Sequence, residues 1–219
     1  MFATLIDFDG VLVDSEPVHL AAFNDVLAPH HVVLSEREYT EQLLSQDDAG
    51  VFRTVLSRQG RTLREEEVRM LVQAKSPRFL ARFAESFRTF PGAAELLARR
   101  AARGPVGIVS GALEGEITFA LDRMQSRATV AFIVSAESPV ASKPDPAPFR
   151  LALEELKRRG HTVPAVAIED SLGGVASAKA AGLRCAAVAH TYGRDELARA
   201  GADVVVDDLA SLTDALLEG

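Results

Sequence analysis

The chain has 219 residues, of which 47% are apolar and 25% charged, and its formal net charge at pH 7 is −7. This length suits one globular domain, or one domain that carries an insertion, and the apolar fraction suffices for a core. A negative chain without a concentrated basic face disfavours nucleic acid as a partner, and no uncharged apolar run reaches the roughly 18 residues that a membrane helix requires. We therefore expect a small-molecule partner, with neither nucleic acid nor membrane involved.

Two features predict a cytoplasmic protein. The first residues lack a basic start followed by a long apolar stretch, which argues against a signal peptide. The single cysteine, Cys185, excludes an internal disulfide and fits a reducing compartment. Its apolar neighbours predict that it lies in a buried strand.

The first predicted element is a buried strand at residues 3–6, which leads directly into two aspartates, Asp7 and Asp9. Burying an unpaired carboxylate is costly, because the charged group loses its hydration. This pair of acids therefore predicts a compensating positive charge from another part of the chain.

The next segment, residues 14–88, contains no convincing strand. Hydrophobic periodicity instead predicts helices at 17–28, 35–44, 47–60 and 63–87, and Ser35 with Glu38 matches a capping box. We expect an all-helical insertion. The predicted domains are a catalytic core of residues 1–13 and 89–219 and a helical cap domain of residues 14–88.

The rest of the chain alternates strand and helix. Apolar, β-rich runs predict strands at 105–110, 130–134, 164–168, 185–189 and 203–206, and helical periodicity predicts helices at 93–102, 114–124, 147–160 and 173–182. Such alternation is typical of a parallel sheet covered on both faces. The predicted fold is α/β, a Rossmann-like three-layer core with an inserted all-helical cap. In the last of these helices, small residues are expected only to allow close packing on the sheet: Gly173, Gly174, Ala176, Ala180 and Gly182.

Acidic residues gather where the predicted strands end, which is where open α/β sheets bind ligands. Side chains at i and i+2 of an extended segment share a face, so Asp7 and Asp9 can point into one cleft. Glu169 and Asp170 follow the strand at 164–168 and should meet them there. These carboxylates outweigh the single lysine expected nearby, Lys143, so we predict that Mg²⁺ neutralises the excess charge.

A phosphate ligand is predicted next, since Mg²⁺ commonly keeps waters and a substrate phosphate in its shell. Ser110, Gly111 and Lys143 are the residues expected to contact it. Ser110 lies where a helix should begin, so its hydroxyl and the Gly111 amide can face a phosphate at a helix N-terminus. Lys143 lies in SKPDPAP, whose three prolines stiffen the loop and whose Asp145 is a predicted N-cap. A stiff loop holds the lysine where it can compensate both a phosphoryl group and a carboxylate.

In this order, these residues resemble the motifs of the haloacid dehalogenase superfamily of phosphohydrolases, over nearly the whole chain. The stretch DFDGV at 7–11 is similar to the first motif, Ser110 to the second, Lys143 to the third, and the Glu169–Asp170 pair to the fourth. The resemblance implies that Asp7 attacks phosphorus to give an aspartyl-phosphate. It implies that Asp9 protonates the leaving oxygen and then activates water.

The resemblance also implies two sets of binding residues. Phosphate would be bound by Gly10, Ser110, Gly111 and Lys143. Mg²⁺ would be held by the Asp7 carboxylate, the Asp9 backbone carbonyl and Asp170, with Glu169 ligating the ion or orienting its ligands.

The helical insertion resembles the cap of the subgroup that contains β-phosphoglucomutase, phosphoglycolate phosphatase and sugar-phosphate phosphatases. His19, in DSEPVH, then either assists proton transfer or hinge closure, as in the mutase-like members, or simply packs. Lys75, in VQAKSPRF, matches a basic cap position that touches substrate in some relatives, and packing is again the alternative.

We expect a Mg²⁺-dependent phosphatase that acts on a small phosphomonoester such as a sugar phosphate, as a monomer or homodimer. The alternative is a β-phosphoglucomutase-like phosphotransferase, which would have to grip a second phosphate. Resembling mutases use a basic residue of a cap loop for this, but residues 39–50 contain no Lys or Arg, so Arg53, Lys75 or Arg78 would have to substitute.

Two other functions fit the sequence less well. A non-catalytic phosphate-binding module would resemble receiver domains, but these are much shorter and carry their acidic pair before the phosphoacceptor strand. Haloacid dehalogenation is disfavoured, because that branch of the superfamily does not need the second aspartate or the metal-binding fourth motif.

Overall fold

The computed structural model describes residues 1–44 and 46–219. Its contacts divide the chain into two compact units, one formed by residues 1–14 and 88–219 and the other by residues 15–87. We call the first the core unit and the second the insertion unit.

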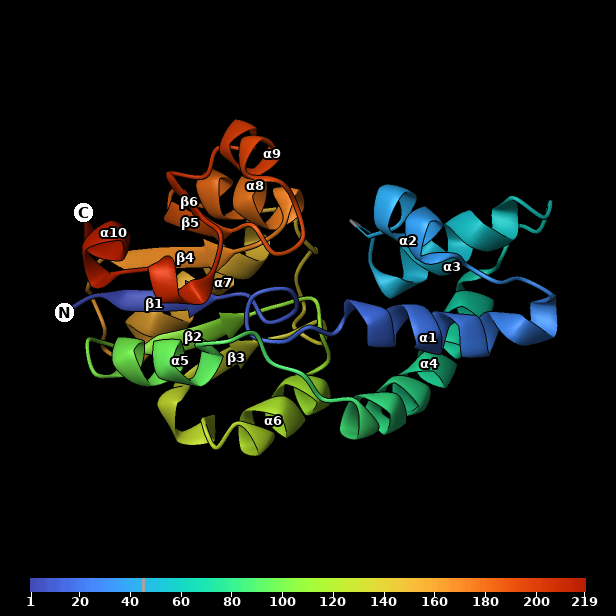
Figure 1. Cartoon of the computed structure of the whole chain (residues 1–219), viewed down its shortest axis with the longest axis horizontal. Helices are drawn as coiled ribbons and strands as arrows, with labels where there is room; N and C mark the ends of the chain where they lie inside the picture. The colour runs from blue at the N-terminus through green and yellow to red at the C-terminus, as the bar shows by residue number, and fades with distance from the viewer. Residues whose placement is uncertain (45) are drawn as a thin grey trace. The chain divides into compact units, whose positions relative to one another are not determined.

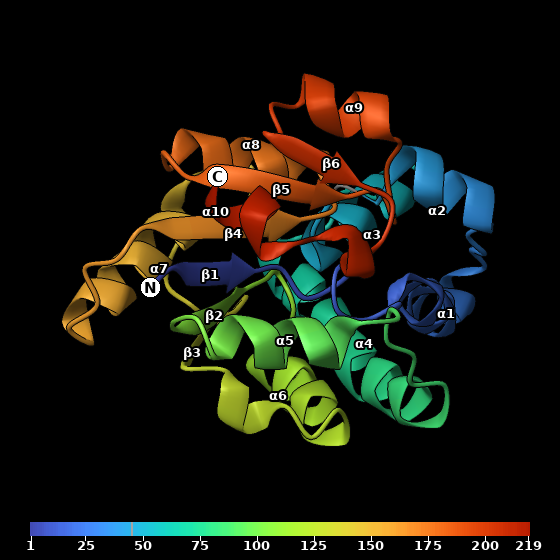
Figure 2. The ribbon, with the colours of Figure 1, turned by 60° about the vertical axis from the view of Figure 1, so that its left-hand side comes forward.

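The core unit is built on a six-stranded sheet with the order β3-β2-β1-β4-β5-β6, in which each neighbouring pair is parallel (Figures 1 and 2). All six predicted strands are confirmed, with ends that shift by one or two residues. The strands are β1 Ala3–Ile6, β2 Val106–Val109, β3 Phe132–Val134, β4 Ala165–Glu169, β5 Arg184–Val188 and β6 Val204–Val206.

Helices cover both faces of this sheet, which confirms the α/β prediction. Figure 2 shows α5 and α6 in front of the strands and α7 and α8 behind them. Phe149 of α7 and Val175 of α8 are fully buried in one apolar cluster with Leu5 of β1 and Val109 of β2. The helices are α5 Ala93–Ala101, α6 Glu114–Arg123, α7 Ala147–Arg158, α8 Leu172–Ala180, α9 Arg194–Arg199 and α10 Asp214–Glu218, with 3₁₀ turns at Arg127–Thr129 and Leu209–Ser211.

The short C-terminal helix α10 is held to α5 by arginines. The fully buried Arg100 donates from Nη1 to Asp214 Oδ1 and to Glu218 Oε1, each at 2.8 Å. Arg103 donates to both oxygens of Glu218 at 2.5 Å. These partners lie more than 100 positions apart in the chain, so no local pattern predicted α10.

Strand β1 lies at the centre of the sheet, between β2 and β4. Its Thr4 is in register with Val106 on one side and Val166 on the other. Because the three strands are parallel, their carboxyl ends lie side by side at one edge. The segments that carry Asp7, Ser110 and Asp170 therefore all leave the sheet at that edge.

The chain leaves the core unit and returns to it along paired backbone. Val13 and Thr89 form an antiparallel bridge, and the Phe90 amide donates to the Leu12 carbonyl at 3.1 Å. The Asp14 amide donates to the Arg88 carbonyl at the same distance, 3.1 Å. The outgoing and returning segments are thus tied to each other before the insertion unit begins.

The insertion unit is helical, and its described residues contain no strand. A buried apolar cluster that includes Phe23, Phe52 and Leu56 forms its centre. The predicted helices are confirmed, although the second is shorter than expected. They are α1 Glu16–Leu27, α2 Glu36–Gln42, α3 Asp48–Ser57 and α4 Glu65–Glu85, with a 3₁₀ turn at Ala28–His30.

Side-chain caps set two of these helix starts. The Ser35 hydroxyl accepts from the Glu38 amide at 3.2 Å, as a capping box requires. The Glu38 carboxylate, however, bonds Arg58 at 2.5 Å. The Asp47 carboxylate caps α3 by accepting from the Gly50 amide at 2.7 Å. No helix in the described part of the chain combines the length and the apolar character needed to span a membrane.

Candidate active site

Asp7 lies just beyond the end of β1, at the entry to a tight turn. The Leu12 amide donates to the Phe8 carbonyl at 2.9 Å, and the Gly10 amide donates to the Val13 carbonyl at 2.9 Å. Gly10 has φ +75°, a backbone conformation that glycine adopts without strain. The turn follows the strand directly, and only 11% of the Asp7 side chain is exposed.

Lys143 joins the acids that follow two neighbouring strands. Its Nζ donates to Asp7 Oδ1 at 2.8 Å, to Glu169 Oε1 at 2.5 Å and to the Val109 carbonyl at 2.8 Å. Only 15% of the lysine side chain is exposed, and Glu169 is fully buried. This ammonium is therefore the positive charge that the acidic first segment requires.

The loop that carries Lys143 is anchored at its far end. The Ser177 hydroxyl, on α8, donates to the Asp145 carbonyl at 2.6 Å. The Asp145 carboxylate accepts from the Ala147 amide at 2.8 Å. Helix α7 begins at Ala147 with Pro146 as its N-cap, so the predicted cap at Asp145 lies one residue too early. These bonds limit the positions that Lys143 can take.

Burial shapes the protonation of this pair. Burial raises the pKa of Asp7 to about 7, with the charges of Glu169 and Asp9 adding to the effect and Lys143 opposing it. Burial alone would lower the pKa of Lys143, but the negative charges of Asp7 and Glu169 raise it above its ordinary value. Lys143 therefore stays protonated at neutral pH, and any further positive charge beside Asp7 would favour its ionised form.

Three buried acids form a candidate metal site. One carboxylate oxygen from each of Asp7, Glu169 and Asp170 lies within 4.8 Å of the others. A single lysine does not balance three carboxylates, and oxygen is the ligand that Mg²⁺ prefers. The donor set and its charge therefore fit a divalent cation. The Asp9 carboxylate is not one of the three, and the resemblance assigns its backbone carbonyl to the metal instead.

Glu169 fits beneath the first turn of α8. The Ser171 hydroxyl donates to its Oε2 at 3.3 Å and also accepts from the Gly174 amide at 3.0 Å, as the N-cap of α8. Gly174 leaves the space that the Glu169 carboxylate occupies. The close packing on the sheet predicted for Gly174 is therefore present, and the sheet residue that it meets is Glu169, at the end of β4. The lower-numbered Gly173 has no such neighbour.

Two residues after β5 touch the site and were missed in the sequence. The Thr191 hydroxyl donates to Asp170 Oδ2. His190 Nδ1 lies 2.8 Å from the Gly10 carbonyl, and its ring stacks on Phe90 with centroids 3.8 Å apart. Sequence analysis placed only His19 near the site. The signal that could have found His190 and Thr191 is their position after a strand that neighbours β4.

Ser110 and Gly111 lie in the loop after β2, before the helix. The Ser110 hydroxyl accepts from the Ala112 amide at 3.1 Å, whereas Gly111 is exposed. Helix α6 begins only at Glu114, because Glu116 accepts from the Leu113 amide and so fixes the first turn there. The expectation that Ser110 stands at the helix N-terminus is therefore wrong.

His19 and Lys75 belong to the insertion unit and contact each other. Lys75 Nζ lies 2.8 Å from His19 Nδ1 and donates to Asp48 Oδ1 at 2.5 Å. It also lies 4.2 Å from the centroid of the Phe23 ring. Only 2% of Lys75 is exposed. Its ammonium thus has partners within its own unit.

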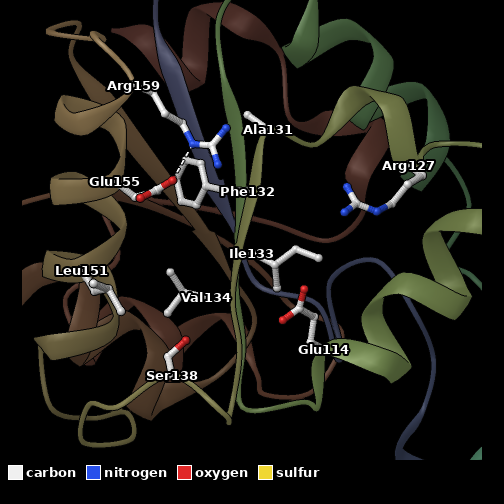
Figure 3. Close-up of a pocket in the computed structure, with 10 residues that line it drawn as sticks. All are labelled: Glu114, Arg127, Ala131, Phe132, Ile133, Val134, Ser138, Leu151, Glu155 and Arg159. Atoms are coloured by element: carbon white, nitrogen blue, oxygen red, sulfur yellow. Dashed lines mark hydrogen bonds and ion pairs between the residues drawn. The ribbon is translucent and has the colours of Figure 1, made fainter.

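A surface pocket of the core unit lies away from this cluster. Its volume is about 350 Å³. Figure 3 shows its lining residues beside the edge strand β3, with Glu114 of α6 on one side and Leu151 and Glu155 of α7 on the other. Arg127 and Glu114 lie on one side of it, and the paired Arg159 and Glu155 on the other. None of its lining residues belongs to the acidic cluster.

Comparison with known proteins gives consistent results. The family model described as haloacid dehalogenase-like hydrolase matches residues 4–188. The chain is 30% identical to a phosphoglycolate phosphatase of Rhodospirillum rubrum, over 98% of this chain and 90% of that protein. It is 34% identical to the protein CbbY of Cereibacter sphaeroides, over 96% and 93% of the two chains. The crystal structure of CbbY from Rhodobacter sphaeroides in complex with phosphate superposes with a TM-score of 0.85 at 30% identity, covering 99% of each chain.

Proposed function

Because the chain belongs to the family of haloacid dehalogenase-like hydrolases, we propose that it is a Mg²⁺-dependent phosphatase that hydrolyses a small phosphomonoester through an aspartyl-phosphate on Asp7. The observation that carries this proposal is the bond from Lys143 to both Asp7 and Glu169, beside the three-carboxylate cluster. This arrangement places the buried Asp7 carboxylate next to the Lys143 ammonium. Transfer of a phosphoryl group needs the first as nucleophile and the second to compensate negative charge.

In the first step, an oxygen of Asp7 attacks phosphorus and the bond from phosphorus to the ester oxygen breaks. Asp9 gives its proton to that leaving oxygen, so the alcohol departs neutral. In the second step, the Asp9 carboxylate takes a proton from water as the water attacks phosphorus. The Asp7 carboxylate is released together with inorganic phosphate, and both acids return to their starting states.

Fixed positive charge and hydrogen-bond donors assist both steps. Lys143 holds Asp7 in one orientation and compensates charge that develops on the phosphoryl oxygens. Ser110, Gly111 and the turn at Gly10 supply donors for the same oxygens. Mg²⁺ would be held by Asp7, Asp170 and the Asp9 carbonyl, with Glu169 as ligand or orienting group, and it would supply further neutralisation of phosphoryl charge.

The substrate class is proposed from the relatives. The similar Rhodospirillum protein is a phosphoglycolate phosphatase, and a CbbY structure that matches at 30% identity contains xylulose-(1,5)bisphosphate. We therefore assign small, soluble sugar or hydroxy-acid phosphates as substrates. Residues 14–88 are proposed as the cap that selects among them, with His19 and Lys75 as its candidate substrate-contacting residues.

The second candidate is a β-phosphoglucomutase-like phosphotransferase. Such an enzyme must hold a second phosphate, yet residues 39–50 contain no Lys or Arg; Ser45 in this stretch lies outside the described residues. The stretch also contributes Asp48, whose carboxylate bonds Lys75. Because Asp48 already pairs with the buried Lys75 ammonium, this cation is less available to bind a second phosphate. This favours transfer of the phosphoryl group to water.

The test is a phosphate-release assay with Mg²⁺ on 2-phosphoglycolate, xylulose 1,5-bisphosphate, N-acetylmuramic acid 6-phosphate and β-glucose 1-phosphate. The last is supplied with a catalytic amount of glucose 1,6-bisphosphate. We expect rapid phosphate release from at least one substrate, none in EDTA, and no accumulation of glucose 6-phosphate. Rapid glucose 6-phosphate formation with little phosphate release would instead establish the phosphotransferase. Phosphate binding without turnover of any substrate would establish a non-catalytic module.

A further inference from the structure

The loop after β5 reaches the acidic site at two adjacent residues. Thr191 donates its hydroxyl hydrogen to Asp170 Oδ2, and His190 Nδ1 lies 2.8 Å from the Gly10 carbonyl oxygen. One residue thus contacts the acid after β4, and its neighbour contacts the turn after β1. The mechanism proposed above assigns no role to His190 or to Thr191.

Gly10 lies close to the hydrogen bond between Thr191 and Asp170. A Cβ atom on Gly10 would lie 1.9 Å from Asp170 Oδ2 and 2.8 Å from Thr191 Oγ1. Three segments, which follow β1, β4 and β5, therefore converge on a single carboxylate oxygen. Because Asp170 is only 4% exposed, neighbouring protein atoms rather than bulk water determine how its carboxylate is turned.

The orientation of Asp170 matters because rotation about the last bond of an aspartate side chain is weakly restricted by itself. A hydroxyl donor at one oxygen selects one orientation. Since each carboxylate oxygen has two lone pairs, accepting this hydrogen does not prevent the group from also binding a cation. Hydrogen bonds of this kind to metal ligands typically change metal affinity by about 10–100-fold.

We propose that Thr191 is a positioning residue that orients Asp170 for divalent-cation binding, with His190 holding the Gly10 turn against the same carboxylate. The inference rests on the proposed function in that it takes Asp170 as a metal ligand. It adds a residue from a loop that none of the acidic motifs includes. It also explains why a polar, uncharged side chain points at a cluster in which negative charge is already in excess.

The test measures binding of Mn²⁺ alone, without substrate, by the loss of its free electron paramagnetic resonance signal. Mn²⁺ shares the preference of Mg²⁺ for oxygen ligands. Thr191→Val keeps the side-chain shape and removes the donor, so we expect its Kd for Mn²⁺ to rise by about tenfold or more. Thr191→Ser restores the hydroxyl and should bind within threefold of the unsubstituted protein. Thr191→Ala removes the hydroxyl without putting a methyl group in its place, as valine does. It should bind Mn²⁺ as weakly as Thr191→Val.

Thr62→Val is the control, because it removes an exposed threonine hydroxyl in the insertion unit. Melting curves in EDTA establish that each variant is folded before metal is added. An unchanged Kd in both Thr191→Val and Thr191→Ala would overturn this inference alone. Mn²⁺ binding without hydrolysis of any phosphomonoester would contradict the proposed function alone. Absence of Mn²⁺ binding by the unsubstituted protein would overturn both.

Discussion

The Cα atom of Gly174 faces the Glu169 carboxylate so closely that a Cβ atom there would lie 1.9 Å from Oε2 and 2.1 Å from Cδ. The lack of a side chain at this position of α8 therefore makes room for the Glu169 carboxylate. Glu169 cannot move aside freely, because it is fully buried and its other oxygen bonds Lys143 at 2.5 Å.

This relationship predicts that Gly174→Ala lowers phosphatase activity at least tenfold, because the displaced Glu169 loses its bond to Lys143 and the metal site is distorted. Gly173→Ala is the matched control, since the nearest atom to its added Cβ would be 4.0 Å away. The control should keep its activity and gain slightly in stability from the better helix propensity of alanine. Equal activities of the two variants, assayed at saturating Mg²⁺, would contradict the steric argument.

Asp7→Asn should abolish turnover and leave the fold intact. The amide has the shape of the carboxylate but cannot attack phosphorus, so phosphate release should fall by roughly 10⁴-fold or more. Circular dichroism would check the fold, and Asp122→Asn, on the exposed face of α6, is the control. Activity of Asp7→Asn within tenfold of the unsubstituted protein would exclude Asp7 as the nucleophile.

Lys75 and Asp48 should respond differently to substitution. Asp48→Ala leaves a buried ammonium without its anion and should destabilise the protein by about 2 kcal/mol. The loss should be smaller than for a fully buried pair, because about a third of the Asp48 side chain is exposed to solvent, which screens the charge. The double variant Asp48→Ala with Lys75→Met removes both charges and should recover most of that loss. Urea unfolding of the single and double variants measures the coupling.

The same variants test the role of Lys75 in substrate binding. If Lys75 serves only the packing of the insertion unit, Lys75→Met keeps its KM. A KM raised more than tenfold in a stable Lys75→Met protein would instead establish a substrate contact. His19→Asn removes the ring that contacts Lys75 Nζ but keeps the Lys75 ammonium. Its KM therefore shows the effect of losing that contact without losing the positive charge.

The attachment of α10 predicts a pH-dependent stability. Hydrogen bonds from Arg103 and Arg100 lower the pKa of Glu218 from 4.5 to about 2. A carboxylate whose folded-state pKa is depressed stabilises the fold above its unfolded pKa, and this contribution is lost as the pH falls toward the folded value. Glu218→Gln should therefore be less stable than the unsubstituted protein at pH 6, and the difference should shrink from about pH 4.5 downward.

Urea midpoints measured from pH 6 to pH 2.5 would check this prediction. Glu154→Gln, which removes an exposed carboxylate of α7, is the control and should show little difference at any pH. A difference for Glu218→Gln that stays constant down to pH 2.5 would show that the arginine bonds do not hold α10 in solution.

The sequence predicted the fold and the charged part of the site because both depend on local patterns. Apolar runs identify the strands, and Asp7, Lys143, Glu169 and Asp170 stand out as charges that follow them. Parallel strands bring their ends to one edge, so these charges could be placed together from the sequence alone.

Features that arise from distant parts of the chain could not be predicted. Thr191 carries no charge and follows a strand with no acidic residue, so nothing local marks it. Gly174 is one of several small residues in α8, and only the position of Glu169 distinguishes it. Lys75 could be read as a basic cap residue, but its partner Asp48 lies 27 positions away and is set by the packing of α3 against α4.

The pairing of Val13 with Thr89 has a consequence for how this architecture can diversify. The two chain segments that bound the insertion are already bonded side by side, so the core closes the loop whatever its length. Lengthening such a loop adds little entropic cost, since the cost grows only with the logarithm of loop length. One catalytic scaffold can therefore accept inserts of different size and sequence, and recombination at these two positions offers a direct route to chimaeric enzymes with new preferences.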